Sequence, residues 1–210
     1  MNVQRREKYL QNYGIFPQRP LVAGSVEGIE QAVVIPALAE RDSLFRTLAG
    51  IARNPSGDLQ RTLVICVVNN HRPPLTSDRE IADNQKTLLI LQSLVFRRPA
   101  SQDLPDGTRE DLRHIAGSDL RLAFIDASSP GLEIPDRDGG VGTARKIGMD
   151  AALRIVDARA AGGGVICCLD ADTLVEENYL SAFQSYFTRT GDPAVVSAYA
   201  HQTPDDPKLP

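Results

Sequence analysis

The sequence predicts an α/β fold in which a mostly parallel central sheet carries helices on both faces. Short and nearly continuous runs of Val, Ile, Leu and Cys recur along the chain, as is typical of strands buried on both faces of a parallel sheet. Segments with apolar residues at helical spacing lie between these runs. This alternation indicates right-handed βαβ units, and a length of 210 residues suits one sizeable domain.

Five apolar runs are predicted as strands. Polar residues follow the ends of several of them, which places possible ligand-binding side chains directly after strands. In chain order the runs are QAVVIPAL around Val34, TLVICVVNN from Thr62, LRLAFIDA from Leu120, GVICCLDAD from Gly164 and AVVSAYA from Ala194.

Four helices are predicted between and after these strands, each with an apolar stripe. The second begins at a possible capping box formed by Ser77 and Glu80. The polar segment 97–117 is expected to be a surface excursion with one short helix at most. The four apolar stripes are Leu44, Leu48 and Ile51; Ile81, Leu88, Leu89 and Val95; Ala144, Ile147, Ala151 and Ile155; and Val175, Tyr179, Phe183, Tyr186 and Phe187.

Composition and charge narrow the class of protein. A net charge of -4 gives no reason to expect nucleic acid as a partner, since nucleic acid favours a basic face. The three cysteines lie inside apolar runs and are expected to be buried, reduced thiols of a cytoplasmic protein. The polar N-terminus does not resemble a signal peptide. The longest apolar run in a helical context, LLILQSLVF, is far shorter than the ~20 residues that span a bilayer; contact with the inner face of a membrane stays open.

The polar residues that follow the strands should converge on one edge of the sheet. Ligands of an open parallel sheet bind beyond the carboxyl ends of its strands. We therefore expect a binding site built from the residues at those ends, which are Pro36 to Glu40, Asn69 and Asn70, Asp126, and Asp170 with Asp172.

The sequence CLDADT places two aspartates, Asp170 and Asp172, at the end of a buried strand. Side chains two residues apart on a strand face the same way, so both carboxylates should point into one cleft if the extended backbone continues through Ala171. Neighbouring carboxylates repel each other, and a Mg²⁺ or Mn²⁺ ion held together with phosphate oxygens would relieve that repulsion. In the alternative interpretation, one aspartate caps the next helix and the other is solvated.

A glycine-rich helix start, GGVGTARKIGMDAAL from Gly139 to Leu153, is the second candidate. Glycines such as Gly142 let the backbone approach a ligand, and a helix N-terminus favours anions. Arg145 and Lys146 lie in the first turns, where their charge opposes the helix dipole and suggests an anionic neighbour. The alternative is a glycine turn with two solvated basic residues.

Two further segments are weaker candidates. In VVIPALAERD, Pro36 is expected to stop the strand and Glu40 to lie at a helix start. In VVNNHRPP, the amides of Asn69 and Asn70 could read a base edge or a ribose, although a role in a turn is equally consistent with asparagine.

The order of these motifs resembles the GT-A glycosyltransferases of family 2. The similarity covers about residues 32–200, and PALAE, VVNN, GVGTARKIG and CLDADT follow one another as in that family. The resemblance implies a Rossmann-like GT-A nucleotide-diphospho-sugar transferase fold. It divides the chain into an N-terminal extension (1–30), a nucleotide-sugar-binding domain (31–202) and a tail (203–210) that could lead to an acceptor-binding part.

The resemblance also implies a function. The chain would move a sugar from a nucleotide-diphosphate sugar to an acceptor that the sequence does not identify, with Asp170 and Asp172 holding the Mg²⁺ or Mn²⁺ ion. The residues implied to border the nucleotide-sugar are Pro36, Ala37, Glu40, Asn69, Asn70, Gly142, Arg145, Lys146, Asp170 and Ala171. Asn69 and Asn70 stand where the family usually has an acid, Ala39 where it has Asn, and Lys146 where Asn is common.

Three other functions are compatible with parts of the sequence. One is a nucleotide-sugar-binding domain without turnover. Another is a sugar nucleotidyltransferase, whose GGxGTR loop resembles GGVGTAR but normally follows the first strand. The third is a haloacid-dehalogenase-type phosphatase, whose D-x-D-x-T motif would need Thr where Leu174 stands. No GxSxG motif or Cys–His arrangement indicates acyl transfer.

Overall fold

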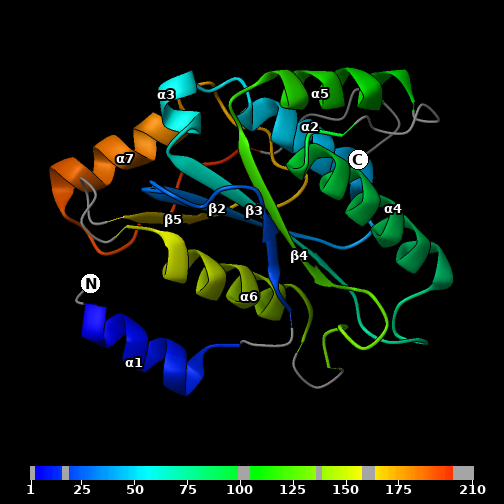
Figure 1. Cartoon of the computed structure of the whole chain (residues 1–210). Coiled ribbons are helices and arrows are strands. Elements are labelled where there is room, and N and C mark those ends of the chain that lie inside the picture. The colour runs from blue at the N-terminus through cyan, green and yellow to red at the C-terminus, as the bar shows by residue number, and fades with distance from the viewer. Residues whose placement is uncertain (1–2, 16–18, 99–104, 136–138, 158–163, 201–210) are drawn as a thin grey trace.

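The computed structural model describes residues 3–15, 19–98, 105–135, 139–157 and 164–200 and has a five-stranded sheet between two layers of helices (Figure 1). The strand order is β1-β4-β3-β2-β5, and all neighbours are parallel except β1 and β4. The strands are β1 (Leu21–Ala23), β2 (Gln31–Ala37), β3 (Thr62–Asn69), β4 (Arg121–Ala127) and β5 (Val165–Cys168). This confirms the predicted α/β class with a mostly parallel sheet.

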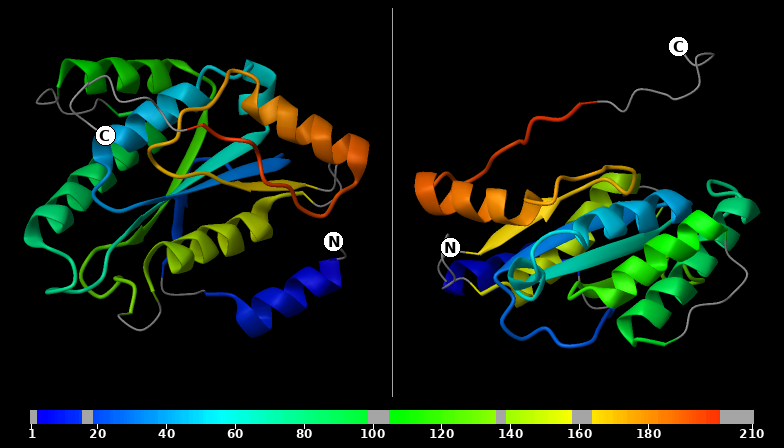
Figure 2. Two further views of the ribbon diagram at one scale, coloured as in Figure 1. Left: turned by 180° about the vertical axis from the view of Figure 1, so that it is seen from behind. Right: turned by 90° about the horizontal axis from the view of Figure 1, so that it is seen from above.

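Four of the five predicted strands are confirmed as β2, β3, β4 and β5, and the fifth is wrong. Residues 194–200 form no strand, and the side chains of Val196 and Tyr199 are 91% and 80% exposed. Strand formation needs a neighbour to pair with, and in the view from above in Figure 2 this segment runs away from the sheet. Conversely, β1 lies in the predicted N-terminal extension, and it joins the sheet because it pairs with β4.

The four predicted helices are confirmed, and three others are present in the described residues. The helices are α1 (Val3–Tyr13), α2 (Arg41–Ile51), α3 (Ser56–Leu59), α4 (Asp78–Val95), α5 (Asp106–Gly117), α6 (Gly140–Ile155) and α7 (Tyr179–Thr190). The capping box of Ser77 and Glu80 is present at the start of α4. The segment expected to be a surface excursion contains the twelve-residue helix α5, which buries Leu112 and Ile115. None of the described helices is long and apolar enough to cross a membrane.

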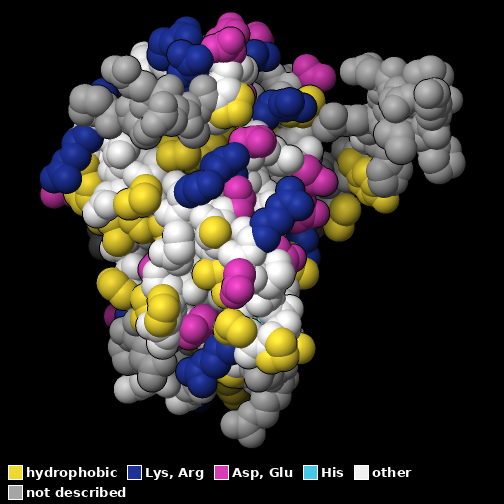
Figure 3. All heavy atoms as spheres, turned by 90° about the vertical axis from the view of Figure 1, so that its right-hand side faces the viewer, with side chains coloured by type: hydrophobic (Ala, Val, Ile, Leu, Met, Phe, Trp, Pro, Cys, Tyr) yellow, Lys and Arg dark blue, Asp and Glu magenta, His cyan; other side chains and the backbone are white. Residues whose placement is uncertain are grey.

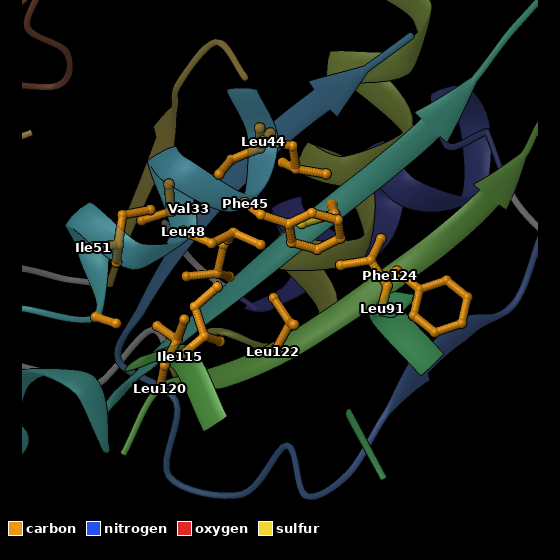
Figure 4. Packing of buried hydrophobic residues seen from close by; sticks show 14 of the residues in the cluster. Val33, Leu44, Phe45, Leu48, Ile51, Leu91, Ile115, Leu120, Leu122 and Phe124 are labelled. Atoms are coloured by element: carbon orange, nitrogen blue, oxygen red, sulfur yellow. The ribbon is translucent and has the colours of Figure 1, made fainter. Parts of the chain in front are cut away.

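The core consists of two apolar clusters, one on each face of the sheet. Successive residues of a strand point to opposite faces, so β2 directs Val33 and Ile35 to one cluster and Val34 to the other. The first cluster packs against α2, α4, α5 and α7, and Figure 4 shows Phe45 at its centre. The second packs against α6, whose Ile147 is fully buried. Both faces are thus covered, as expected for a doubly wound sheet.

The strand order defines where a ligand would bind. The chain proceeds from β2 to β3 and β4 in one direction, and α6 then returns it across the other face to place β5 on the opposite side of β2. In doubly wound sheets, ligands bind outside the carboxyl ends of the strands where the order reverses. Here that place lies beyond the ends of β2 and β5.

The N-terminal helix α1 lies on the outer side of α6 (Figure 2) and is attached mainly through polar contacts. The buried carboxylate of Asp150 accepts hydrogen bonds from the Tyr9 hydroxyl (3.1 Å), the Ile15 amide (3.0 Å) and the Lys146 ammonium (2.7 Å). The Lys146 ammonium also lies 5.1 Å from the centre of the Tyr9 ring, within range of a cation–π interaction. A short, mostly polar helix gives no apolar stripe in the sequence, which explains why α1 was not predicted.

Charged side chains are mixed over the face shown in Figure 3, where Lys and Arg lie beside Asp and Glu. Ion pairs among the described residues include Arg41 with Asp83 on neighbouring helices.

Candidate functional site

The ends of β2 and β5 bring together acidic and basic side chains from three segments of the chain. Arg145, in the second turn of α6, forms an ion pair with Asp170, which follows β5. Glu40 precedes the first residue of α2 and lies close enough to Asp170 and Asp172 for both to affect its pKa. The convergence predicted for these residues is therefore present at the place where the strand order reverses.

The two aspartates reach this edge by a backbone route other than the one expected. Strand β5 ends at Cys168, and the Thr173 amide donates to the Asp170 carbonyl (3.2 Å), so the chain turns between the two aspartates. The assumption that the extended backbone continues through Ala171 is wrong. The turn is attached to α2, because the buried Thr47 hydroxyl of that helix donates to the Ala171 carbonyl (2.8 Å). Both aspartate side chains are exposed.

The carboxyl group of Glu40 is in an environment that disfavours its charge. Partial burial raises its pKa, the Leu38 amide that donates to the carboxylate (3.2 Å) lowers it, and the charges of Asp172 and Asp170 raise it further. Three carboxyl groups thus repel one another at this edge, with Arg145 as the cation paired with one of them. A bound cation would relieve this repulsion.

The start of α6 combines open space with a positive charge, as predicted for an anion site. Gly139 precedes the helix with φ of 56°, a left-handed conformation that glycine adopts without strain. Gly142 is exposed, and a side chain added there would meet nothing within 4 Å. The Gly140 amide donates to the Nε2 atom of His71 (3.3 Å), whose Nδ1 lies 3.2 Å from the Ile134 carbonyl. No pattern in the sequence indicates that His71 lies against this helix.

Lys146, predicted to face an anion, has another position. Its ammonium pairs with Asp150 and contacts Tyr9 of α1. Consecutive residues on a helix point about 100° apart, and here Arg145 pairs with Asp170 while Lys146 pairs with Asp150. The structure therefore corrects the assignment of Lys146, which attaches α1 to α6.

The amides of Asn69 and Asn70, predicted to read a base or a ribose, are buried within the protein. Asn69 donates to the carbonyls of Ala37 (3.0 Å) and Val67 (3.2 Å). Asn70 donates to the His71 carbonyl (2.9 Å) and accepts from Asn84 of α4 (3.0 Å). The structure supports the alternative, structural interpretation of both residues, since they could reach a ligand only by giving up these bonds.

The remaining predicted residues, Pro36, Ala37 and Ala171, form the buried floor of the edge. Strand β2 continues through Pro36 to Ala37 beside β3, so Pro36 does not stop the strand as expected. On the β5 side the last bond runs from the Leu169 amide to the Val34 carbonyl (3.0 Å). The backbone groups of Pro36 point to the same side of β2 as those of Val34, which is the side of β5. The N–H that proline lacks would therefore face a position beyond the end of β5.

Cys168 lies beside these charged groups and corrects the expectation that all three thiols are buried. Cys66 and Cys167 are buried, but Cys168, the last residue of β5, is exposed. Desolvation raises the pKa of the Cys168 thiol, the charge of Arg145 lowers it and that of Asp170 raises it. A four-residue strand that ends at the surface explains the exposure.

The two aspartates at this edge are exposed, and the acidic side chains do not surround a common centre. Within the ranges that the structure describes, no group of three or more His, Cys, Asp or Glu side chains is arranged to hold a metal ion. Two hollows lie elsewhere: one of about 680 Å³ between α2 and α5, and one of about 360 Å³ beside α3 and α5. None of the candidate residues lines either hollow.

Comparison of the chain with models of protein families, with curated proteins and with solved structures finds no match. The chemistry of the edge is therefore inferred from its own residues. These are two exposed aspartates, a glutamate whose charge is disfavoured, an arginine paired with one aspartate, and an open glycine-rich helix start.

Replacing Glu40 with glutamine should stabilise the chain relative to the wild type, and this difference in unfolding free energy should grow as the pH rises. The pKa of Glu40 is raised from its ordinary 4.5, so the unfolded chain loses this proton first. Stability therefore falls as the pH rises from about 4.5 through the higher pKa of the folded state. The gain should stay below about 1 kcal/mol, because the group is only half buried and water screens its charge.

Urea unfolding of the wild-type chain and the Glu40→Gln variant, at several pH values between 4 and 8 and with EDTA present, measures this difference. Glutamine keeps an oxygen that can accept from the Leu38 amide, so the comparison isolates the charge. A difference in unfolding free energy that does not change with pH would contradict the raised pKa of Glu40, which burial and then the charges of Asp172 and Asp170 cause.

Proposed function

We propose that the chain binds a nucleotide-diphosphate sugar at the ends of β2 and β5 and transfers the sugar to an acceptor, as a GT-A-type glycosyltransferase. The observation that carries this proposal is the meeting of Asp170, Asp172 and Arg145 where the strand order reverses. Diphosphate and a divalent cation are complementary to these groups, since the cation would neutralise the acids and the diphosphate would pair with Arg145.

The acids fit an open Mg²⁺ or Mn²⁺ site. Mg²⁺ commonly uses one or two carboxylates and completes its coordination with phosphate oxygens and water. Asp170 and Asp172 offer hard oxygen ligands on an exposed turn, and phosphate oxygens of the substrate and water would supply the other ligands. When bound, the ion would offset the charge of the diphosphate.

In the proposed reaction, an acceptor hydroxyl oxygen forms a bond to the anomeric carbon of the sugar. The bond between that carbon and the diphosphate oxygen breaks, and its electron pair leaves with the diphosphate. Arg145 stabilises this negative charge, and the open start of α6 lets the phosphates approach. The hydroxyl proton passes to a general base or to solvent water.

Calorimetric titration with UDP-, GDP-, ADP- and dTDP-sugars, with Mn²⁺ or with EDTA, tests the proposal. We expect at least one nucleotide-sugar to bind, with affinity at least about tenfold higher when Mn²⁺ is present. Equal affinity in EDTA would contradict the metal site, and no binding at all would contradict the proposed substrate. Metal-dependent hydrolysis of the bound donor then separates a transferase from a domain that only binds nucleotide-sugars.

A further inference from the structure

Three consecutive polar side chains in the second turn of α4 connect the ends of three strands. Asp83 binds the start of α2, Asn84 binds the turn after β2 and the end of β3, and Gln85 binds the turn after β4. An amphipathic helix usually directs such positions to the core or to water. Here all three form hydrogen bonds at the carboxyl edge of the sheet.

Asn84 is the central member of this group. Its side chain is buried, with 1% of the residue exposed. The amide oxygen accepts from the Ala39 amide (2.8 Å), and the amide nitrogen donates to the Asn69 carbonyl (3.0 Å) and the Asn70 side-chain oxygen (3.0 Å). One side chain therefore joins the turn after β2 to the end of β3.

Asp83 and Gln85 extend the same connection on either side. The Asp83 carboxylate accepts from the Arg41 amide (3.3 Å) and pairs with the Arg41 guanidinium (3.4 Å). Glu40 makes no side-chain cap on α2, so a side chain of α4 binds the first amide of this helix. The Gln85 amide lies 3.3 Å from the Ser129 hydroxyl in the turn after β4.

The turn held by Asn84 has an unfavourable backbone conformation. Ala39 has φ of 54°, a left-handed conformation that costs a residue with a Cβ about 1–2 kcal/mol. Asn84 binds the Ala39 amide and Asp83 binds the Arg41 amide, so both neighbours of Glu40 in the chain are held by α4. The conformation that directs Glu40 toward Asp170 and Asp172 thus depends on side chains of α4.

We infer that Asn84, assisted by Asp83 and Gln85, is a positioning residue of the site at the ends of β2 and β5. It holds Ala39 in the left-handed conformation and thereby fixes the backbone of the turn that carries Glu40. The inference rests on the proposed function only where nucleotide binding is measured, because the backbone effect can be observed without a ligand.

The experiment compares the wild-type chain with Asn84→Ala, Asn84→Ala combined with Ala39→Gly, and Lys86→Ala as an exposed control on the same helix. Amide hydrogen exchange, followed without ligand, should be at least about tenfold faster at Ala39 in Asn84→Ala and unchanged in Lys86→Ala. Glycine adopts positive φ freely. The double variant should therefore recover part of the melting temperature that Asn84→Ala loses.

Affinity for UDP with Mn²⁺ gives the second measurement. Residues that only orient a metal or its ligands typically change affinity 10- to 100-fold, and we expect about a tenfold loss in Asn84→Ala with partial recovery by Ala39→Gly. Unchanged exchange at Ala39, or no recovery in the double variant, would overturn the inference. If the wild-type chain binds no nucleotide, the proposed function fails, and exchange and thermal recovery still decide the role of Asn84.

Discussion

Replacing Gly148 with alanine should lower the free energy of unfolding by about 2 kcal/mol, because α6 rests directly on the sheet at this residue. A Cβ at position 148 would overlap the Cγ1 atom of Val34 and lie 3.0 Å from the Cγ2 atom of Val67. Both valines are fully buried strand residues, and β-branched side chains have few alternative rotamers. Helix α6 would have to move away from β2.

The size of the effect follows from two opposing contributions. Overpacking a core costs about 1–3 kcal/mol, and more where the neighbours cannot move, whereas alanine is more favourable than glycine inside a helix by about 1 kcal/mol. The steric cost should prevail. In a domain of this size, about 2 kcal/mol corresponds to a fall in melting temperature of roughly 4–8 °C.

Gly142→Ala is the matched control, since it is the same substitution in the same helix. A Cβ there meets nothing within 4 Å, so this variant should be neutral or more stable by up to about 1 kcal/mol. Opposite signs for the two variants, measured by urea unfolding, would show that close packing and not helix propensity requires Gly148. A Gly148→Ala variant as stable as Gly142→Ala would disprove this account of the packing of α6.

Most parts of the fold that bury apolar residues were predictable from the sequence, with the exception of α5, which buries Leu112 and Ile115. Strands β2 to β5 and helices α2, α4, α6 and α7 each carry an apolar pattern that matches their geometry. The three-residue strand β1 and the polar helix α1 carry none, because they are held by pairing with β4 and by the contacts of Asp150. The run AVVSAYA has the composition of a strand, but it pairs with none of the strands in the described residues.

For the candidate site, the rule that ligands bind beyond the carboxyl ends of parallel strands predicted which segments meet. The assignment of individual side chains to a ligand was less successful. The rule placed Glu40, Asp170 and Asp172 at one edge, and the charges of both aspartates act on the pKa of Glu40. It could not tell which neighbouring side chain faces the edge. Lys146 pairs with Asp150, while Asn84 of α4 accepts a hydrogen bond from the Ala39 amide beside Glu40. Only tertiary contacts decide such orientations.

Replacing Asp172 with alanine should reduce the affinity for the nucleotide-sugar in Mn²⁺ by at least about 100-fold, because a lost metal ligand should cost no less than a lost supporting residue, for which 10- to 100-fold is typical. In EDTA the same substitution should have little effect or a small favourable one, since it removes an acid near the diphosphate. Replacing Asp172 leaves the ion pair between Arg145 and Asp170 in place. Removing Asp170 would also release Arg145 and change two contributions at once.

The control is Glu177→Ala, which removes the same charge from an exposed residue near the far end of the sheet. Its neighbour Glu176 accepts from Asn54, beyond the C-terminal end of α2, whereas Glu40 lies at the start of that helix. If the loss in Asp172→Ala reflected only the general negative charge of the chain, Glu177→Ala would show it as well. A large loss in Asp172→Ala alone, present with Mn²⁺ and absent with EDTA, identifies a carboxylate that acts through the metal. Equal behaviour of the two variants would remove the metal from the proposed mechanism and leave Arg145 and the start of α6 as the basis for binding an anion.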